Sequence, residues 1–251
     1  MALVEVESNG PVRTVTLNRP AKRNAMNEAL LEQLYAAFSD PPADDERVTV
    51  IRAAGAVFCS GMDLAQRRES LGSPATIVDS LRAIENYALP VVAVVQGHAI
   101  AGGNELALHC DFVVASSKAN FGMSLSQVGL APTWFLTKKL MEVCGPVGAR
   151  EILFLGDPLS ATRMHELGFI ARVAEPDQLD VEAQKIIDRL AANAPLSLRM
   201  MKKTLVRQMA FRDATPYDDI DEEVRVVSTS DDAREGVSAR LEKREATFNG
   251  R

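Results

Sequence analysis

The sequence predicts an α/β protein in which a parallel sheet is followed by a helical C-terminal region. Three observations lead to this fold class. The apolar run VVAVV at 91–95 is typical of a strand that is buried on both faces. A helical pattern at 98–111 and a second apolar run, FVVAS at 112–116, follow it, and this strand–helix–strand order favours parallel strands. Beyond about Pro146 the pattern is mainly helical.

The residues before this unit predict strands and helices in alternation. Two strands are expected at 3–7 and 12–18, joined by the turn signal SNGP. Asn27 is expected to cap a helix over 28–38, because four large apolar residues of that segment share one face. A third strand is predicted at 47–54, and a further helix between Pro74 and Pro90.

The C-terminal part predicts helices with one short strand among them. The expected helices cover 148–155, 160–167, 178–194, 196–208, 216–230 and 231–248, and the expected strand covers 169–173. These helices are expected to pack on the α/β core or on a neighbouring subunit.

Composition excludes several classes of protein. The 251 residues, 47% of them hydrophobic, are enough for one large domain or a core domain with an appendage. A formal net charge of −6 argues against a nucleic-acid-binding surface, and no apolar stretch has the length of a membrane span. The three cysteines, Cys59, Cys110 and Cys144, lack the spacing of a metal site. Their odd number and the absence of a signal-like N-terminus predict a reducing, cytoplasmic setting.

The segment HAIAGGNELALHCD at 98–111 combines glycines with a carboxylate at the start of a helix. Gly102 and Gly103 lie where a strand is followed by a helix, so a ligand oxygen can approach unpaired backbone amides closely. Such amides suit an oxyanion, and Glu105 lies in the first helical turn beside them. The alternative is structural, because an acidic residue in the first turn stabilises a helix through its dipole.

A second loop of the same type is GAVFCSGMDL at 55–64. It also follows a predicted strand, and the exposed amide here would be that of Met62, beside Gly61. The alternative is an ordinary loop in which Asp63 caps the next helix. Because an oxyanion hole commonly has two donors, the two loops together favour the catalytic interpretation of both.

These two loops, with three other segments, resemble the crotonase, or enoyl-CoA hydratase/isomerase, superfamily. The matching segments are LNRPAKRNAMN at 17–27, GAVFCSGMDL at 55–64, GHAIAGGNELALHCD at 97–111, ANFGMSLSQVGLAP at 119–132 and DDAREGVSARLEKREATF at 231–248. They occur in the family's order along nearly the whole chain.

The resemblance implies a crotonase-like spiral core over 1–195 and a C-terminal helical trimerisation region over 196–251. It implies a homotrimer or a dimer of trimers that binds acyl-CoA thioesters. No metal and no separate cofactor are expected, because coenzyme A enters as part of the substrate.

Carried over residue by residue, the resemblance also assigns roles. The backbone amides of Met62 and Gly102 would hold the thioester oxygen, and Glu105 matches one of the family's two catalytic glutamates. Lys22, Arg23, Asn24 and Ala25 would line the CoA site, and Lys243 matches a lysine that reaches a CoA phosphate in some members. Arg67 and Arg68 are looser phosphate candidates, and the alternative for them is a solvated face.

The most informative departure from the family pattern is Leu125, which stands where the second glutamate is expected. No carboxylate occurs between Phe112 and Met141. Hydration of a conjugated thioester is best served by two carboxylates that share a water, whereas one carboxylate can move a proton along an enolate. The sequence therefore favours double-bond isomerisation over hydration, with Glu105 as the single acid/base.

Other features leave alternatives open. Trp134 and Phe135 replace small residues, so they either reshape the acyl pocket or, for Trp134, anchor the core or a trimer interface. His98 is the best backup acid/base, although a histidine in such a loop is more often a packing or hydrogen-bonding residue. A second function also remains open, that of a CoA-ester binding protein with little or no catalysis, which Leu125 and the bulky pair would explain.

Overall fold

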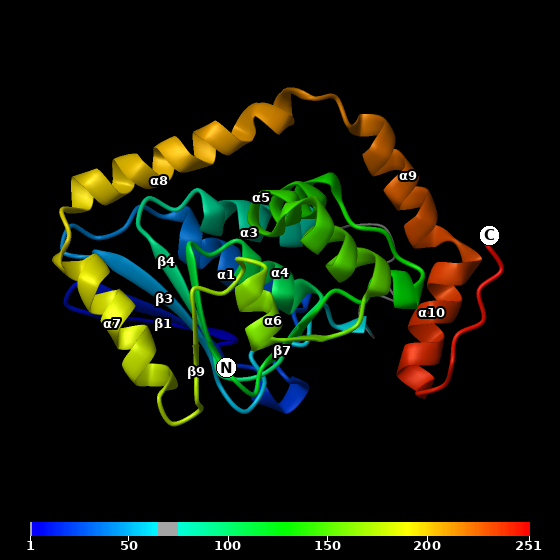
Figure 1. Cartoon of the computed structure of the whole chain (residues 1–251), viewed down its shortest axis with the longest axis horizontal. Coiled ribbons are helices and arrows are strands. Elements are labelled where there is room, and N and C mark those ends of the chain that lie inside the picture. The colour runs from blue at the N-terminus through cyan, green and yellow to red at the C-terminus, as the bar shows by residue number, and fades with distance from the viewer. Residues whose placement is uncertain (1, 65–74) are drawn as a thin grey trace.

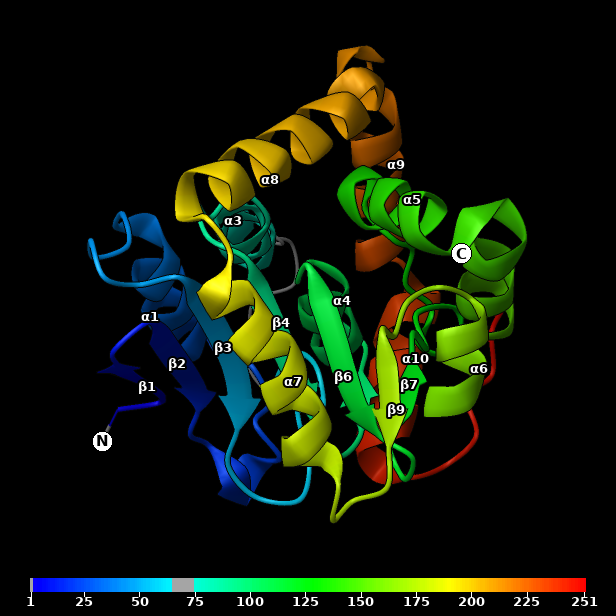
Figure 2. The ribbon, with the colours of Figure 1, turned by 60° about the vertical axis from the view of Figure 1, so that its left-hand side comes forward.

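A mostly parallel sheet forms the centre of the protein. The computed structural model describes residues 2–64 and 75–251. Within them the main sheet has the strand order β1-β2-β3-β4-β6-β9, and its strands lie side by side in Figure 2. In this sheet only β1 and β2 pair antiparallel, so the predicted parallel arrangement is confirmed. The bounds are β1 (Val4–Asn9), β2 (Val12–Leu17), β3 (Val48–Ala53), β4 (Val91–Val95), β6 (Phe112–Ser116) and β9 (Arg172–Ala174).

Both faces of β4 are buried, as its unbroken apolar run predicts. Val91, Ala93 and Val95 belong to the larger hydrophobic cluster, to which α1 (Glu28–Ser39), α3 (Ala75–Glu85) and α4 (Gly102–Leu108) contribute. Val92 and Val94 face the opposite side, where α7 (Leu179–Ala192) packs across the sheet (Figure 2). Successive side chains of a strand point to opposite faces, so one short strand joins the two clusters.

A second, smaller sheet lies beside the first and was not predicted from the sequence. Its order is β5 (Ala99–Ile100), β7 (Asn120–Gly122) and β8 (Leu159–Ser160). Strands of two or three residues are too short to show a period-two pattern, which explains why pattern analysis missed them. β5 leads almost directly into α4 and thereby fixes where that helix begins.

Helix α5 (Trp134–Arg150) starts well before the segment 148–155 that the sequence indicated. Thr133 caps it, since its hydroxyl accepts a hydrogen bond from the Leu136 amide at 3.1 Å. Gly145, with φ 65°, and Pro146 break the helical pattern in the interior, so the apolar periodicity is interrupted. A π-helical turn (Glu151–Leu155) and α6 (Ala161–Glu166) follow.

The C-terminal helices form an arm around the α/β core. Figure 1 shows α8 (Pro195–Met209) crossing the molecule, with α9 (Asp218–Thr229) and α10 (Asp231–Glu242) along one side. The predicted boundary at residues 195 and 196 coincides with the start of α8, and the division into two domains and the trimer stay predictions. Buried Lys202 of α8 donates to Asp111 Oδ2 at 2.6 Å and so attaches the arm to the core.

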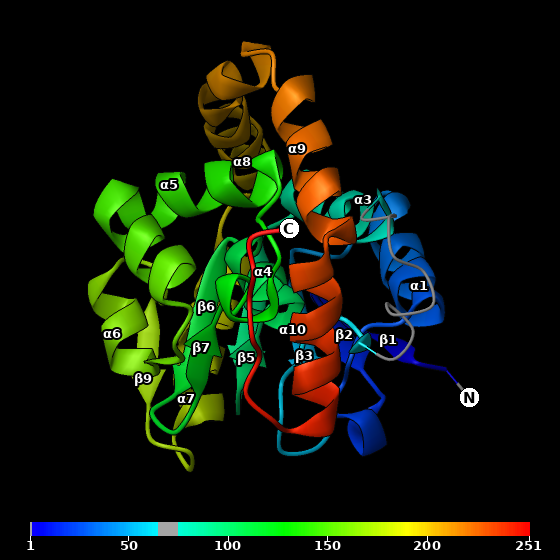
Figure 3. The same ribbon diagram turned by 90° about the vertical axis from the view of Figure 1, so that its right-hand side faces the viewer.

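The helix predicted over 231–248 is too long. It ends at Glu242, and Lys243 adopts a left-handed conformation with φ 56°. The reason is a competing contact, because the backbone amides of Asn249 and Gly250 donate to the carboxylate of Asp232. The last residues therefore fold back beside α10 (Figure 3). Among the described residues, no helix combines the length and apolar character that a membrane span requires.

Candidate active site

The structure brings the two glycine loops into direct contact. Met26 and Met62 form a β-bridge, as do Cys59 and Ala99, and the Ile100 amide donates to the Cys59 carbonyl at 2.9 Å. At Gly61, with φ +90°, an added Cβ would lie 2.9 Å from the Ile100 carbonyl oxygen and 3.2 Å from the Gly102 nitrogen. The backbone around Met62 and Gly102 can approach this closely only because residue 61 is glycine.

The amides of Met62 and Gly102 are free to bind a ligand. Neither donates a hydrogen bond to any group in the part of the chain that the structure describes. Ala101, directly before Gly102, has φ 49° and ψ −119°, a conformation that is costly for a residue with a Cβ. Its own amide donates to the Gly122 carbonyl at 2.7 Å, and this hydrogen bond from β7 helps to hold the turn.

Glu105 lies one helical turn beyond these amides and is almost fully buried. Its backbone amide donates to the Ala101 carbonyl at 3.0 Å, so the side chain is carried by the first turn of α4. Burial raises the pKa of the Glu105 carboxyl to about 7. No hydrogen bond or ion pair to its carboxylate is formed by the described residues. Glu105 is therefore balanced between its acid and base forms near neutral pH.

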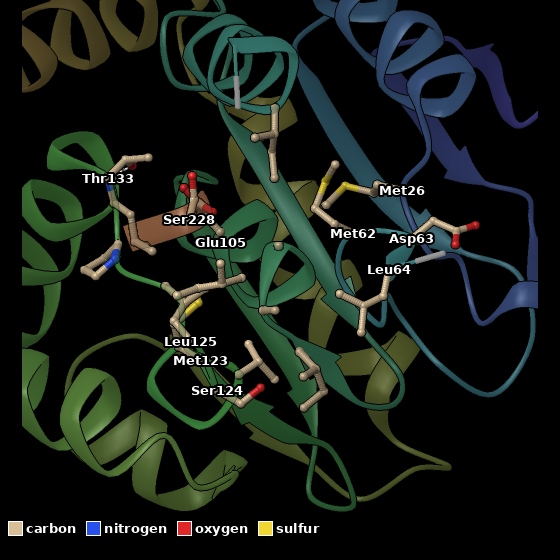
Figure 4. Close-up of a pocket in the computed structure, with 18 of the residues that line it drawn as sticks. Met26, Met62, Asp63, Leu64, Glu105, Met123, Ser124, Leu125, Thr133 and Ser228 are labelled. Atoms are coloured by element: carbon tan, nitrogen blue, oxygen red, sulfur yellow. Dashed lines mark hydrogen bonds between the residues drawn. The ribbon is translucent and has the colours of Figure 1, made fainter. Parts of the chain in front are cut away.

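A cavity of about 230 Å³ surrounds Glu105. In Figure 4, Met62 and Asp63 lie on one side of Glu105, and Thr133 lies on the other; Ser228 also lines the cavity. Most of the remaining wall is apolar; it includes Met26, Leu31, Ile77, Val78, Ile100, Met123, Leu125, Val128, Leu130, Leu136 and Val224. The cavity can therefore take an apolar ligand with a polar group at the Met62 and Gly102 amides.

Leu125 faces the same cavity as Glu105, as its position in the sequence predicts. Two other carboxylates line the cavity in the described residues. Asp63 forms an ion pair with Arg19 at 2.9 Å, and Glu28 is exposed in the first turn of α1. Glu105 is thus the buried carboxyl of this set.

The residues expected at the CoA moiety lie outside the cavity lining. Lys22 and Arg23 are exposed, and Asn24 is fully buried. The Asn24 amide group donates to the carbonyls of Ala54 and Val57 at 2.9 and 2.8 Å, so this side chain holds two loops together. Ala25 is buried as well. The CoA role of these four residues stays a prediction.

At the other predicted CoA contact, α10 presents a different residue. Lys243 is exposed at the end of the helix, whereas Arg240, one turn earlier, lines the cavity. Arg240 was missed because a basic residue on a charged helix shows no pattern that marks it as functional. Arg67 and Arg68 lie outside the described residues.

The remaining candidates do not line the cavity. His98 is exposed, does not line the cavity, and its Nδ1 accepts a hydrogen bond from the Asn120 amide at 3.2 Å. Trp134 stacks on Tyr217 with ring centroids 5.3 Å apart, and Phe135 stacks on His109 at 4.4 Å. Neither aromatic residue lines the cavity, so the bulky pair does not reshape it directly. Cys59 is buried and its thiol contacts the Asn24 carbonyl.

The cavity thus combines two loops with free amides, a buried carboxyl of raised pKa and a largely apolar wall. Residues 7–251 match the protein family described as enoyl-CoA hydratase/isomerase. The chain belongs to this family. It is an enzyme that acts on acyl-CoA thioesters, and the resemblance read from the five segments is confirmed.

Individual relatives of this enzyme catalyse different reactions. The 1,2-epoxyphenylacetyl-CoA isomerase of Escherichia coli (strain K12) is 33% identical over 250 residues, which cover 96% of this chain and 95% of the relative. The short-chain-enoyl-CoA hydratase of Clostridium acetobutylicum is 29% identical over 248 residues, which cover 96% of this chain and 95% of the relative.

Solved structures confirm the crotonase-like fold. A methylmalonyl-CoA decarboxylase in complex with 2-nitronate-propionyl-CoA has a TM-score of 0.90 at 25% identity and covers 100% of this chain and 99% of its own. An enoyl-CoA hydratase/isomerase from Pseudoalteromonas atlantica T6c has a TM-score of 0.86 at 30% identity, and the match covers 99% of this chain and 100% of that structure's chain.

Proposed function

We propose that this enzyme moves the double bond of an enoyl-CoA, with Glu105 as its single acid/base. The observation that supports this most directly is the pairing in one cavity of buried Glu105 with Leu125, where the family's second carboxylate is expected. The free amides of Met62 and Gly102 beside it supply two donors for the thioester oxygen.

The reaction follows from these three groups. The Glu105 carboxylate removes a proton from C2 of a 3-enoyl-CoA, and the electron pair of the broken C–H bond moves through the carbonyl to the thioester oxygen. The Met62 and Gly102 amides stabilise the resulting dienolate. The protonated Glu105 then returns the proton to C4, the double bond forms between C2 and C3, and the carboxylate is restored.

Burial of Glu105 serves both halves of this cycle. A carboxyl with a pKa of about 7 is a stronger base than an exposed one, and its acid form is still populated near neutral pH. Because the forward reaction begins with the carboxylate, we expect kcat/KM to rise with pH through about 7.

Hydration is the second candidate reaction. The short-chain-enoyl-CoA hydratase among the relatives favours it, and Asp63 also lines the cavity. Asp63 is held by Arg19 at 2.9 Å, however, which makes it a poor partner for a water shared with Glu105. Membership in an enzyme family argues against the alternative of a binding protein without catalysis.

For the CoA moiety we propose Lys22, Arg23, Asn24, Ala25 and Lys243 as contacts, with Arg240 added from the structure. Asn24 acts indirectly, because its buried side chain shapes the loop that carries the others. The homotrimer or dimer of trimers also belongs to the proposal. Exposed apolar residues on the arm, among them Leu196, Met200, Met201, Leu205 and Phe211, support assembly.

The test compares purified enzyme on 3-enoyl-CoA and 2-enoyl-CoA substrates by the absorbance of the conjugated thioester. We expect the absorbance to appear from the 3-enoyl substrate faster than it is lost from the 2-enoyl substrate. Faster loss from the 2-enoyl substrate would make hydration the main reaction. If Glu105→Ala leaves both rates unchanged, Glu105 is not the acid/base.

A further inference from the structure

One part of the cavity wall carries polar groups that the proposed reaction does not use. It is formed by Thr133, at the start of α5, and by one face of α9. Val224, Arg225 and Ser228 line the cavity from that helix, at spacings that place them on one side. In Figure 4, Thr133 lies across Glu105 from Met62 and Asp63, and Ser228 overlaps Glu105 in that view.

The acyl chain must run toward this wall. The thioester oxygen is placed at the Met62 and Gly102 amides, and Glu105 has to reach the carbon atoms next to the carbonyl. Continuing past Glu105 leads to Thr133 (Figure 4), and Ser228 also lines the cavity. The lining also includes Leu125 and Leu136, so the cavity offers the acyl chain apolar side chains as well as the polar groups of this wall.

The groups of the polar wall can bind an anion. Thr133 Oγ1 accepts the capping hydrogen bond from the Leu136 amide at 3.1 Å, which leaves its own hydroxyl proton to donate. Arg225 carries five N–H donors in a fork that matches a carboxylate. The Ser228 hydroxyl donates to the Arg225 carbonyl at 2.8 Å, so it can rotate to another acceptor at the cost of one bond.

The existing partner of Arg225 holds it weakly. Its guanidinium pairs with Glu222 at 2.7 Å, and the two side chains are 58% and 63% exposed. Exposed pairs of this kind contribute about 0–1 kcal/mol, so an incoming carboxylate can compete for the guanidinium. The acidic residues of the first turn of α9 do not line the cavity.

We propose that the preferred substrate carries a carboxylate at the far end of its acyl chain, bound by Arg225 together with the Thr133 hydroxyl. The substrate class is then the monothioesters of unsaturated dicarboxylic acids. This inference rests on the proposed function for the direction of the chain, and it names the substrate of the same site.

The experiment measures kcat/KM for two matched series of 3-enoyl-CoA substrates with acyl chains of five to eight carbons. One series ends in a carboxylate and the other in a methyl group. We expect one chain length at which the carboxylate-ended substrate is preferred at least about tenfold, the value of one charged hydrogen bond. In Arg225→Met this preference falls by about 10–100-fold, and Arg225→Lys retains part of it.

Arg234 provides a matched control. It also sits on an arm helix, is 58% exposed and pairs with the acidic residue three positions earlier, Asp231, at 2.5 Å. Unlike Arg225, it does not line the cavity. Arg234→Met should therefore leave both the rates and the preference unchanged.

Two outcomes overturn the proposal. One is equal turnover of the two series, and the other is a preference for the carboxylate that survives in Arg225→Met. If neither series is isomerised, the proposed function fails, and calorimetry with the saturated dicarboxylic monothioesters still decides the inference. The inference is supported if these monothioesters bind more tightly than the methyl-ended analogues and lose that advantage in Arg225→Met. Equal binding of the two kinds of ligand contradicts it.

Discussion

Two buried glutamates, Glu105 in the first turn of α4 and Glu85 beside His109 at the other end of that helix, show how neighbours, and not burial, decide what a carboxyl can do. Glu105 is 8% exposed and Glu85, the last residue of α3, is 9% exposed. Burial raises the pKa of Glu105 to about 7. Burial also acts to raise the pKa of Glu85, but contact with His109 and Lys139 outweighs it and holds that pKa well below the usual range.

The difference lies in what surrounds each carboxylate. Lys139 of α5 donates to Glu85 Oε1 at 2.6 Å, and His109, which follows α4, lies 3.6 Å from Oε2. His109 also stacks on Phe135 of α5. Glu85 thus links α3, α4 and α5, while Glu105 faces a cavity. The Glu85 carboxylate holds the three helices together, and the Glu105 carboxyl is left free to exchange a proton.

The largest expected effect comes from Glu105→Gln. Loss of a general acid/base lowers rates by about 10²–10⁴-fold, and we expect kcat for isomerisation to fall within this range. Stability should rise, because a buried acid whose folded pKa is above its unfolded pKa costs free energy once the pH exceeds the unfolded value near 4.5. The gain grows up to pH 7 or so, where it reaches about 3 kcal/mol.

Urea unfolding of the wild type and Glu105→Gln at pH 4.5 and pH 8 measures this gain. Glu28→Gln, at the exposed rim of the same cavity, is the control; it should leave the rate unchanged and, as an acidic residue in the first turn of α1, should lose at most about 1 kcal/mol rather than gain stability. Equal stability of Glu105→Gln and wild type at pH 8 would contradict the raised pKa.

Gly61→Ala tests the cavity region without changing any charge. The new Cβ would meet the Ile100 carbonyl and the Gly102 nitrogen, so the two amide-bearing loops must separate. Loss of one oxyanion donor costs about 10²–10³-fold in kcat, and we expect a loss of this size. Gly10→Ala is the control, because Gly10 also has positive φ (+56°) but has open space around it. It should lose some stability and no activity.

Glu85→Gln tests the other member of the comparison. Removing one partner of a buried ion pair costs about 3–5 kcal/mol, because it leaves the remaining charge uncompensated. Since the folded pKa of Glu85 is lowered, its contribution is present above the unfolded pKa and is lost as the pH falls toward the folded one. Urea unfolding at pH 7.5 should show the loss, and it should shrink in acid.

The folded fraction of Glu85→Gln should keep kcat/KM within a few-fold of wild type. Glu166→Gln, which removes an exposed partner of Arg163, is the matched control and should be nearly neutral. If Glu85→Gln loses activity as completely as Glu105→Gln while still folded, the division of roles between the two carboxyls is wrong.

Sequence patterns predicted those helices and strands that are determined by their own residues. Asn27 caps α1, with its side chain accepting from the Leu30 amide at 3.1 Å, and β4 is buried on both faces. The glycines at 102 and 103 do mark the start of a helix. The second sheet was missed because β5 and β7 owe their pairing to each other rather than to their own sequence.

At the site, the sequence indicated the cavity-lining residues Met62, Gly102, Glu105 and Leu125. It did not indicate Thr133, Arg225 or Ser228; the latter two lie on α9, which the fold of the arm brings to the cavity although Arg225 is 120 residues beyond Glu105 in the chain. The Glu85–His109–Lys139 cluster was missed for the same reason, since each member comes from a different part of the chain.

Leu125→Glu has the smallest expected effect. It tests whether giving Glu105 a carboxyl neighbour changes the reaction that Glu105 supports. It places a second carboxyl in the cavity of Glu105, where a like charge raises the pKa of both groups. The pair would share one proton near neutral pH, and a water between the two carboxyls could then be activated. We expect hydration of 2-enoyl-CoA to increase relative to isomerisation, measured on both substrates with the same preparation. Leu125→Gln, similar in size and uncharged, is the control. A rise in hydration with glutamine as well would mean that space or polarity, and not a second acid, limits hydration in this cavity.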